Sequence, residues 1–527
     1  MKYIFIVLLA ALFFSFSDKK QSGRQVSSAK RKPNFLFAIA DDQSYPHASA
    51  YQSSVYKTPV FDSISSKGLL FLNAFAAAPQ CSPCRAAILT GRNIWQLEEA
   101  GTHSSLFPSK FPVFTQSLEQ DGYFVGFTGK PWSPGNFKAS GWKQNPVGRE
   151  YNERKLNRVP ATGISNNDYA LNFEDFLKEK PADKPFFFWF GSFEPHRDYE
   201  QGSGAASGLR KSDLRVPSFL PDNDIVQNDL LDYALEINWF DKQLGEIIRV
   251  LRASGELENT YVVITADNGM PFPSAKANLQ EYGIHVPLAL AGPGIVKPGR
   301  KIVDLISLID LAPTFLDLAG VDHFPGITGE SMMDLLVNDR KNNNKSNRQF
   351  VLTGRERHTH ARPDNLGYPA RAIRTKEFLY IHNYEPGRWP VGDPALDNQP
   401  DVAKSKDLKP IVYGYEDVDD SPTKTMLIQQ ADQFRFWTNL SLAKRDEDEL
   451  YAIEKDPECL NNLAKDLSYK KNLLEMKLLL QSNLAKQGDP RELGNGNIFE
   501  SYPRFGLMRP FPGFRERGTY NKAYGNK

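Results

Sequence analysis

The chain has 527 residues, of which 40% are hydrophobic and 12% aromatic, enough for a large buried core and more than one domain. Its formal net charge at pH 7 is +1, because 64 Lys and Arg side chains balance 63 Asp and Glu side chains. This balance excludes nucleic-acid binding driven by a global positive field. An anionic partner would have to bind at a local cluster of positive charge.

The first predicted element is a targeting segment. One lysine precedes an apolar run from Tyr3 to Phe16, and Ser15 and Ser17 offer small residues for cleavage. The run is shorter than the roughly 20 apolar residues that a membrane span needs. Residues 1–17 are therefore predicted to be a cleaved signal peptide, with a short membrane anchor as the alternative. We expect a periplasmic or secreted protein with no membrane contact after cleavage.

Four short runs are almost wholly apolar, which is typical of strands buried on both faces of a parallel sheet. They are residues 34–40, 123–128, 186–190 and 261–266. Helical patterns alternate with them, among them residues 229–253 and 307–320. This alternation predicts an α/β domain over residues 33–338, with a mostly parallel sheet sandwiched by helices.

A second, smaller domain is predicted after a polar stretch without apolar residues at 339–347. Strand-like runs at 349–352 and 378–382, and a helix-rich segment after them, indicate an α+β domain over residues 348–485. Residues 486–527 are rich in Gly, Pro, Arg and Phe and are expected to form an irregular tail.

Polar side chains follow each of the four predicted strands at once. They are Asp41 and Asp42, then Gly129-Lys130, then Glu194-Pro195-His196-Arg197, and then Asp267-Asn268-Gly269. Ligand sites of open α/β sheets form at the carboxyl ends of strands, so four such coincidences on one edge predict a single site. The carboxylates and the amide supply hard oxygen ligands without sulfur or imidazole. That set suits Ca²⁺, suits Mg²⁺ less well, and argues against zinc.

The stretch CSPCRAAILTGR, residues 81–92, holds two of the three cysteines of the chain. It predicts a helix that begins at Cys81 and ends before Gly91. Arg85 lies one turn after Cys81, so a helix N-terminus and a guanidinium together favour an oxyanion site. A redox pair or a disulfide with Cys84 is the alternative, whereas structural zinc would need two more ligands and one thiol remains.

The same stretch resembles the C-x-P-x-R…TGR signature of the type I, formylglycine-dependent sulfatases of the alkaline-phosphatase-like superfamily. ADD precedes it, and GK and DNG follow it, in the order that this family shows. Within the family, the chain resembles heparan N-sulfatase (sulfamidase) and its bacterial relatives, through stretches such as FFFWFGSFEPHR, GYPARAIR and ELYAIEKDPECLNNLAKD. The likeness is spread over most of residues 33–466 and is weak in the tail.

The resemblance implies an alkaline-phosphatase-like fold and hydrolysis of sulfuric esters. It implies that a formylglycine-generating maturation enzyme oxidises Cys81 to an aldehyde. One hydroxyl of the aldehyde hydrate attacks sulfur, and the other later expels sulfate. It further implies that Asp41, Asp42, Asp267 and Asn268 hold Ca²⁺, that Arg85 steadies the hydrate, that Lys130 and Lys276 neutralise the sulfate, and that His196 protonates the leaving group.

The chain departs from the family pattern at two positions. Many relatives have a histidine two residues after the Lys of the GK motif. This chain has Trp132 there, whose indole donates a hydrogen bond but cannot act as a base. His103 is a candidate replacement. The sulfamidase carries Arg at the position of Lys276, although other members use Lys, so specificity for N-sulfate is not transferred.

A local basic cluster lies early in the second predicted domain, at residues 354–362 (GRERHTHAR), with Arg371 and Arg374 after it. Arg pairs well with carboxylate and sulfate, so the cluster favours a polyanionic saccharide, with a solvated charged loop as the alternative. The expected substrate-binding residues are Arg355, Arg357, His358, His360, Tyr368, Arg371 and Trp389. The predicted function is an exported sulfatase that acts on sulfate esters or sulfamates of a sulfated polysaccharide, a glycosaminoglycan or an algal polymer, or of its oligosaccharides.

Two other functions stay open on the sequence. One is a formylglycine-dependent phosphonate or phosphate monoester hydrolase of the same superfamily, which the motifs do not separate from a sulfatase. A two-zinc phosphatase would be expected to have the motif DHG where this chain has DNG. The other is a non-catalytic saccharide-binding protein, if Cys81 stays unmodified.

Overall fold

The computed structural model of the chain describes residues 31–338, 348–362, 364, 366–394 and 414–505. The predicted signal peptide at residues 1–17 and the predicted boundary loop at 339–347 lie outside the described residues. Among the helices of the described part, none combines the length and the hydropathy that crossing a bilayer requires.

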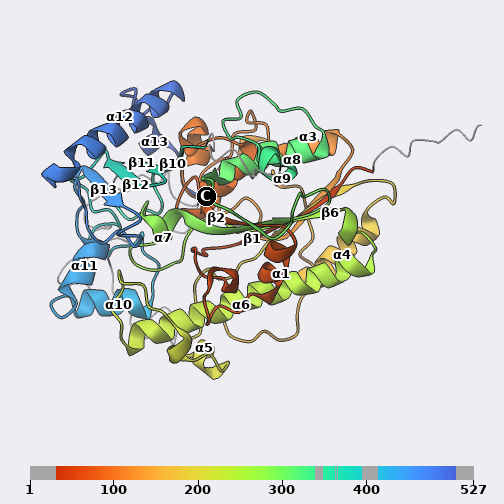
Figure 1. The fold of residues 1–527 in the computed structure, drawn as a ribbon, viewed down its shortest axis with the longest axis horizontal. Helices are drawn as coiled ribbons and strands as arrows, with labels where there is room; N and C mark the ends of the chain where they lie inside the picture. The colour runs from red at the N-terminus through yellow and green to blue at the C-terminus, as the bar shows by residue number, and fades with distance from the viewer. Residues whose placement is uncertain (1–30, 339–347, 363, 365, 395–413, 506–527) are drawn as a thin grey trace, which may run out of the picture. The chain divides into compact units, whose positions relative to one another are not determined.

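A mostly parallel sheet forms the centre of the first part of the chain (Figure 1). Its strand order is β4-β3-β5-β1-β6-β7-β2-β8, with β9 paired to β2, and within this sheet β7 runs antiparallel to both of its neighbours. The strands are β1 Asn34–Ala40, β2 Leu69–Phe75, β3 Phe124–Gly129, β4 Arg149–Glu150, β5 Phe186–Gly191, β6 Thr260–Ala266, β7 His285–Ala291, β8 Arg300–Ile302 and β9 Ile306–Ser307. The four strands predicted from apolar runs are β1, β3, β5 and β6, and they lie next to one another.

Helices cover both faces of this sheet, with α1, α4 and α6 on one face and α2, α3 and α8 packed together on the other (Figure 1). Their bounds are α1 Pro59–Lys67, α2 Cys81–Thr90, α3 Phe114–Gln120, α4 Tyr169–Glu179, α5 Ser203–Ala206, α6 Asp224–Ala253, α7 Glu281–Ile284, α8 Leu311–Ala319 and α9 Met333–Val337. Strand side chains alternate between the faces. Phe35 and Phe37 of β1 contact Phe315 of α8, with ring centroids 5.5 and 5.6 Å apart, whereas Phe190 of β5 contacts Phe240 of α6.

An antiparallel sheet of order β10-β11-β12-β13 forms after the first sheet ends. Its strands are β10 Phe350–Arg355, β11 Ala370–Thr375, β12 Phe378–Asn383 and β13 Asp448–Ala452, and its helices are α10 Pro422–Gln429, α11 Arg435–Leu442, α12 Lys470–Lys486 and α13 Ile498–Ser501. Helix α12 packs on β11 and β12, whereas α10 packs on α6 of the first part. The described residues from 33 to 505 form one compact unit that contains two sheets.

The carboxyl ends of β3, β5, β1 and β6 line up at one edge, because these strands are adjacent and parallel. Backbone hydrogen bonds continue between the strands beyond their ends. Lys130 N donates to Gly191 O (2.7 Å), Asp41 N donates to Glu194 O (3.0 Å), and Asp267 N donates to Ala40 O (3.2 Å). The four loops that carry the predicted site residues thus start side by side.

Candidate active site

The predicted metal ligands meet at this edge of the sheet. Carboxylate oxygens of Asp41, Asp42 and Asp267 and the Sγ of Cys81 all lie within 4.8 Å of one another. The Nδ2 of Asn268 donates to Asp42 Oδ1 over 2.7 Å, although these two residues are 226 positions apart in the sequence. All five side chains are buried.

The backbone at Asp42 explains how two consecutive carboxylates face one site. Successive side chains of an extended strand point to opposite sides. Asp42 has a φ of 74°, in the left-handed region that non-glycine residues rarely adopt. Its N–H donates to Asp267 Oδ1 over 3.1 Å, which fixes this turn. Asp41 and Asp42 therefore both reach the cluster.

Three basic side chains contact the carboxylates. The pairs are Lys130 Nζ with Asp41 Oδ2 at 2.5 Å, Arg85 Nε with Asp267 Oδ2 at 2.8 Å, and Lys276 Nζ with Asp42 Oδ2 at 2.6 Å. A buried ion without a partner costs several kcal/mol. In each of these buried pairs, the charge of one side chain is therefore stabilised by the charge of the other.

The pKa values of the carboxylates reflect this crowding. Burial opposes the ionisation of Asp41, yet Lys130 and His196 hold its pKa well below the ordinary value. Burial and the neighbouring Asp41 raise the pKa of Asp267 to about 7, although Arg85 contacts it. Carboxylates in this condition are stabilised by a bound cation, whose charge favours their ionised form.

Two buried oxygen atoms of this cluster accept no hydrogen bond within the described part of the chain, namely Asp41 Oδ1 and Asn268 Oδ1. Buried acceptors without a partner are rare in folded proteins. Because both belong to a group of hard oxygen ligands, a divalent cation would satisfy them. Ca²⁺ and Mg²⁺ both prefer carboxylate and amide oxygens as ligands.

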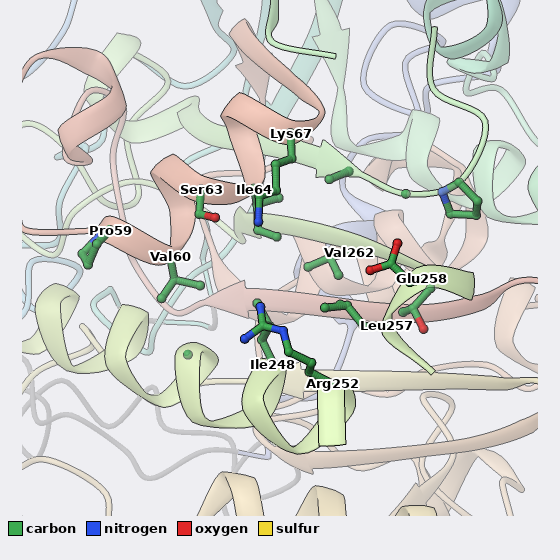
Figure 2. Close-up of a pocket in the computed structure, with 15 residues that line it drawn as sticks. Pro59, Val60, Ser63, Ile64, Lys67, Ile248, Arg252, Leu257, Glu258 and Val262 are labelled. Carbon is green, nitrogen blue, oxygen red and sulfur yellow. The ribbon is translucent and has the colours of Figure 1, made fainter. Parts of the chain in front are cut away.

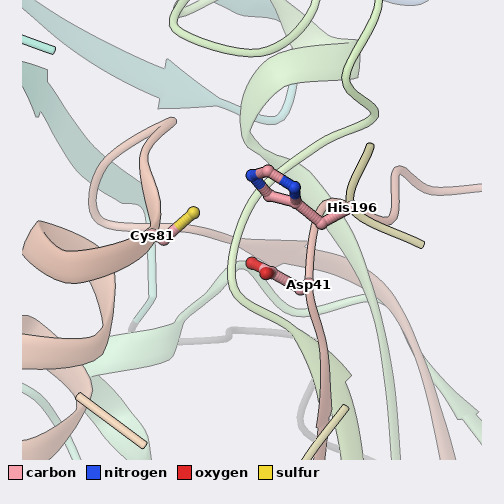
Figure 3. A group of neighbouring side chains, drawn as sticks. All are labelled: Asp41, Cys81 and His196. Carbon is pink, nitrogen blue, oxygen red and sulfur yellow. The ribbon is translucent and has the colours of Figure 1, made fainter. Parts of the chain in front are cut away.

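Cys81 and His196 face this cluster. Figure 3 shows the side chains of Cys81, Asp41 and His196 directed into one space, and one ligand atom of each lies within 4.8 Å of the others. The Nδ1 of His196 lies 2.5 Å from the carbonyl oxygen of Arg197 and therefore carries a proton, which leaves Nε2 to face the site, 3.8 Å from Asp42 Oδ2. The His196 side chain is 33% exposed, so the site opens to solvent beside it.

Helix α2 holds Cys81 and Arg85 as the sequence predicts. It begins at Cys81 and ends at Gly91, whose φ of 64° is the left-handed conformation that favours glycine at a helix end. Arg85 Nη1 donates to the carbonyls of Lys130 (2.7 Å) and Pro131 (3.1 Å), which ties the helix to the loop after β3.

The three cysteines are all buried and free, so the C-x-x-C spacing does not mark a disulfide. Cys84 belongs to the main core around the large sheet, whereas Cys459 packs in an apolar cluster with Leu379 and Ile381 of the second sheet. The groups of possible metal ligands among the described residues contain no pair of thiols. Among the described residues, the thiols therefore offer no support for a structural zinc site.

Trp132 and His103 lie around the first turn of α2. The Nε1 of Trp132 donates to Ser82 O over 3.1 Å, so the indole is the hydrogen-bond donor that the sequence analysis expects. His103 Nδ1 lies 3.0 Å from the carbonyl oxygen of His358, and burial lowers the pKa of His103 well below its ordinary value. Its role as a base stays a prediction.

Six of the seven residues predicted to bind substrate are buried, namely Arg355, Arg357, His358, His360, Tyr368 and Arg371, and Trp389 is half-buried. The arginines contact groups of the chain itself. Arg371 is bonded to Asp489 (2.6 Å) and Glu356 (2.8 Å), and Arg355 lies 3.4 Å from Asp417. The basic cluster is therefore not a solvated loop, and its assignment to substrate binding stays a prediction.

Asp419 is a residue of the site that was not predicted from the sequence. Its Oδ2 lies 2.9 Å from Lys276 Nζ, and its carboxylate lies within 4.8 Å of ligand atoms of Asp42 and His196. In the sequence it belongs to the acidic run DVDD before Ser421, which is typical of solvated charges at a helix N-terminus. No local pattern distinguishes it from such charges.

A cavity of about 420 Å³ lies elsewhere, between α1, α6 and the start of β6 (Figure 2). Its lining combines aliphatic side chains such as Ile64 and Ile248 with the charged side chains of Lys67, Arg252 and Glu258. Because it includes Thr260 and Val262 at the amino end of β6, it belongs to the edge of the sheet opposite the carboxylate cluster. The cavity is therefore separate from the candidate active site.

Comparison with known proteins identifies the family. The family model described as Sulfatase matches residues 33–321, more than half of the chain. This chain belongs to the sulfatase family. A second model, N-sulphoglucosamine sulphohydrolase, C-terminal, matches residues 275–401. The chain is accordingly a sulfuric ester hydrolase, and its resemblance to sulfamidase-like members is confirmed.

Three similar proteins illustrate the range of this likeness. The N-sulphoglucosamine sulphohydrolase of Homo sapiens is 28% identical over 390 residues, which cover 67% of this chain and 74% of that protein. An ulvan-active sulfatase of Formosa agariphila is 27% identical over 386 residues, covering 70% of this chain and 69% of that protein. The structure of a phosphonate monoester hydrolase of Agrobacterium radiobacter superposes with a TM-score of 0.61 at 18% identity, covering 87% of this chain and 97% of that chain. The last likeness shows the alkaline-phosphatase-like fold alone.

Proposed function

We propose that this chain is an exported sulfatase that removes sulfate groups from a sulfated polysaccharide or its oligosaccharides. The observation that carries the proposal is the position of Cys81, at the start of α2 and within 4.8 Å of three clustered carboxylates. Lys130 and Lys276 supply positive charge beside it. Export is supported by the apolar segment at residues 3–16.

The proposed metal is Ca²⁺, held by Asp41, Asp42, Asp267 and Asn268, where it would polarise the sulfate oxygens and favour an ionised nucleophile. The two unpartnered oxygens in this set support the assignment. Oxidation of Cys81 by a formylglycine-generating enzyme would supply a hydrated aldehyde as the nucleophile.

Lys130 and Lys276 are proposed to neutralise the sulfate group. Their ammonium groups now contact Asp41 and Asp42, which are also the proposed metal ligands. A divalent cation would compete with the lysines for these carboxylates and leave ammonium protons for a bound anion. Arg85 stays bound to Asp267 and to the carbonyl of Lys130, and so holds the start of α2 in place.

His196 is proposed to protonate the leaving oxygen or nitrogen of the saccharide. The N–H at Nδ1 donates to the carbonyl of Arg197, so Nε2 is the atom that faces the site and exchanges a proton with the substrate. The imidazole is also the most exposed of the proposed catalytic groups, which supports an approach of the saccharide from its side of the site.

A saccharide is the proposed substrate class because relatives carry the names N-sulphoglucosamine sulphohydrolase and ulvan-active sulfatase. Of the seven predicted substrate residues, Trp389 is the most exposed, and a half-buried indole is a side chain on which a sugar can pack. The buried arginines are proposed to act indirectly, by holding the segments that border the site.

The proposal is tested by two measurements on enzyme co-expressed with a formylglycine-generating enzyme. The intact mass of the tryptic peptide that contains Cys81 should show conversion to the aldehyde and no thiol alkylation. The same sample should hydrolyse an aryl sulfate faster than the matching aryl phosphonate, and chelation should abolish the activity until Ca²⁺ is restored.

Two outcomes would replace the proposal by its alternatives. A clear preference for the aryl phosphonate would make the chain a phosphonate or phosphate monoester hydrolase. An unmodified Cys81 in every preparation, together with binding of sulfated oligosaccharides, would make it a non-catalytic saccharide-binding protein.

A further inference from the structure

The ammonium group of Lys276 is held between two carboxylates that come from distant parts of the chain. Its Nζ lies 2.6 Å from Asp42 Oδ2 and 2.9 Å from Asp419 Oδ2. The three side chains are 4%, 0% and 4% exposed, so water contributes little to solvating their charges. Burial disfavours the charged lysine, but Asp419 and Asp42 together raise its pKa well above the ordinary value.

The loop that carries Asp419 is anchored through Asp417, two positions before it. Asp417 Oδ1 accepts hydrogen bonds from the N–H of Thr359 (2.9 Å) and from its hydroxyl (2.7 Å), and Asp417 Oδ2 accepts one from Arg362 (2.8 Å). The N–H of Asp417 donates to the carbonyl of Val391 over 2.9 Å. The basic cluster that follows β10 thus fixes the loop that carries Asp419.

The same loop is also joined to the segment that carries His196. The hydroxyl of Thr423, in the first turn of α10, donates to Asp229 Oδ2 over 2.6 Å. Asp229 in turn binds Arg197 through two hydrogen bonds of 2.7 and 2.9 Å. The segment from Asp417 to Thr423 therefore contacts both sides of the site, at Lys276 and next to His196.

We propose that Asp419 is a positioning residue of the sulfatase site, which aims the ammonium group of Lys276 at the sulfate of the substrate. This inference rests on the proposed function. A lysine ammonium has three donors. One of them donates to Asp42 Oδ2, and the carboxylate of Asp419 forms an ion pair with the ammonium group at 2.9 Å. The two carboxylates hold the ammonium group from two sides, so Asp419 restricts the directions in which its remaining donors point.

A bound divalent cation makes this role of Asp419 more important. The cation would draw the carboxylate of Asp42 toward itself and weaken the contact of Asp42 with Lys276. Asp419 is not one of the four proposed metal ligands, and its ion pair with Lys276 would then be the main anchor of the ammonium group. Without Asp419, the flexible side chain of Lys276 would lose its second anchor and would reach the sulfate in fewer of its conformations.

The test is a double-mutant cycle with Asp419→Ala, Lys276→Ala and the combined variant, measured on an aryl sulfate with Ca²⁺-loaded, aldehyde-bearing enzyme. We expect Asp419→Ala to lower kcat roughly 10- to 100-fold, the range typical of residues that orient a ligand-binding group. Because Asp419 acts through Lys276, the combined variant should be no slower than Lys276→Ala alone. The matched control is Asp420→Ala, which removes the neighbouring carboxylate that pairs with Lys424.

Additive losses in the combined variant, or a wild-type kcat in Asp419→Ala, would overturn the inference. Thermal unfolding midpoints of all variants show whether a loss of activity is a loss of fold. If Asp419→Ala does not fold, Asp419→Asn keeps the size of the side chain and removes its charge, and it enters the cycle instead.

A second readout separates this inference from the proposed function. The affinity for inorganic sulfate is measured by calorimetry on the same variants in the presence of Ca²⁺. Asp419→Ala should weaken sulfate binding in the wild-type background and leave it unchanged in the Lys276→Ala background. If the wild type binds sulfate but does not hydrolyse the aryl ester, the proposed function fails and the cycle in binding still decides the inference. If the wild type binds no sulfate, both fail.

Discussion

At the scale of single residues, the two cysteines of CSPC have different surroundings. Cys81 Sγ lies 3.9 Å from Asp42 Oδ1 and faces the carboxylate cluster, whereas Cys84 is fully buried in the main core. Cys81 is the first residue of α2, where the helix end lies next to the carboxylates, whereas Cys84 lies within the first turn and packs in the core. The position of each cysteine along the helix therefore separates a reactive position from a packing position.

Cys81→Ala is expected to lower kcat/KM on an aryl sulfate by roughly 10³-fold or more, as loss of a nucleophile does in other covalent hydrolases. Cys84→Ala should keep activity within about threefold and lower the free energy of unfolding by about 1 kcal/mol, the effect of a small deletion in a core. Steady-state rates and thermal unfolding of both variants check this. Equal loss of activity in both folded variants would contradict this separation and favour the redox-pair interpretation.

At the scale of elements, two glycines allow the ends of β3 and β5 to approach closely. A Cβ on Gly191 would overlap the carbonyl oxygen of Lys130, and a Cβ on Gly129 would overlap the carbonyl oxygen of Gly191. The carbonyl of Lys130 also accepts hydrogen bonds from Arg85 and from Trp189. Close pairing of these strand ends therefore sets the positions of two predicted catalytic side chains at once.

Gly191→Ala is expected to destabilise the fold by about 3 kcal/mol or more, because the added methyl group would meet backbone that has no room to move. It should also displace Lys130 and reduce activity in whatever folded protein remains. Denaturant unfolding and the rate per folded molecule measure the two effects. Gly387→Ala is the matched control, since no atom lies within 4 Å of the Cβ it would add. Equal stability of the two variants would contradict this account.

At the scale of the whole molecule, buried ion pairs join the two sheets. Glu281 of α7 lies 2.6 Å from the guanidinium of Arg374 in β11 and 3.0 Å from Nδ1 of His285 in β7. Burial opposes ionisation of Glu281, but Arg374 and His285 hold its pKa at about 2, below the ordinary 4.5. A carboxylate with a lowered pKa stabilises the fold above its unfolded pKa and loses this contribution as the pH falls toward its folded pKa.

We therefore expect the wild type to lose about 2 kcal/mol more stability than Glu281→Gln between pH 5 and pH 3. The variant should start less stable at pH 7, because it leaves Arg374 buried without its charged partner. Urea unfolding at several pH values gives both curves. Glu447→Gln, on a side chain that is 62% exposed, should follow the wild type. Parallel curves for the wild type and Glu281→Gln would contradict the role of this ion pair.

The sequence by itself determined the large sheet and the main site. Apolar runs such as 34–40 and 186–190 can be buried only in a sheet covered on both faces, and polar residues follow each run at once. Parallel strands align their carboxyl ends, so Asp41, Asp267 and Lys130 could be assigned to one edge of the sheet from the sequence alone. The motif at Cys81 predicted the start of a helix, because the start of a helix depends on only a few neighbouring residues.

Only the tertiary structure decided which charges serve the site and which serve the fold. Arg355 and Arg371 look like anion-binding residues in the sequence, but each is buried against carboxylates of the chain. Asp419 looks like a solvated charge, yet it contacts Lys276. Charge pairing depends on distances between residues that are 15 to more than 100 positions apart, and no local pattern encodes such distances. Sequence periodicity predicts which face of a helix or strand is buried. The packing of one element on another determines which side chains the buried residues contact.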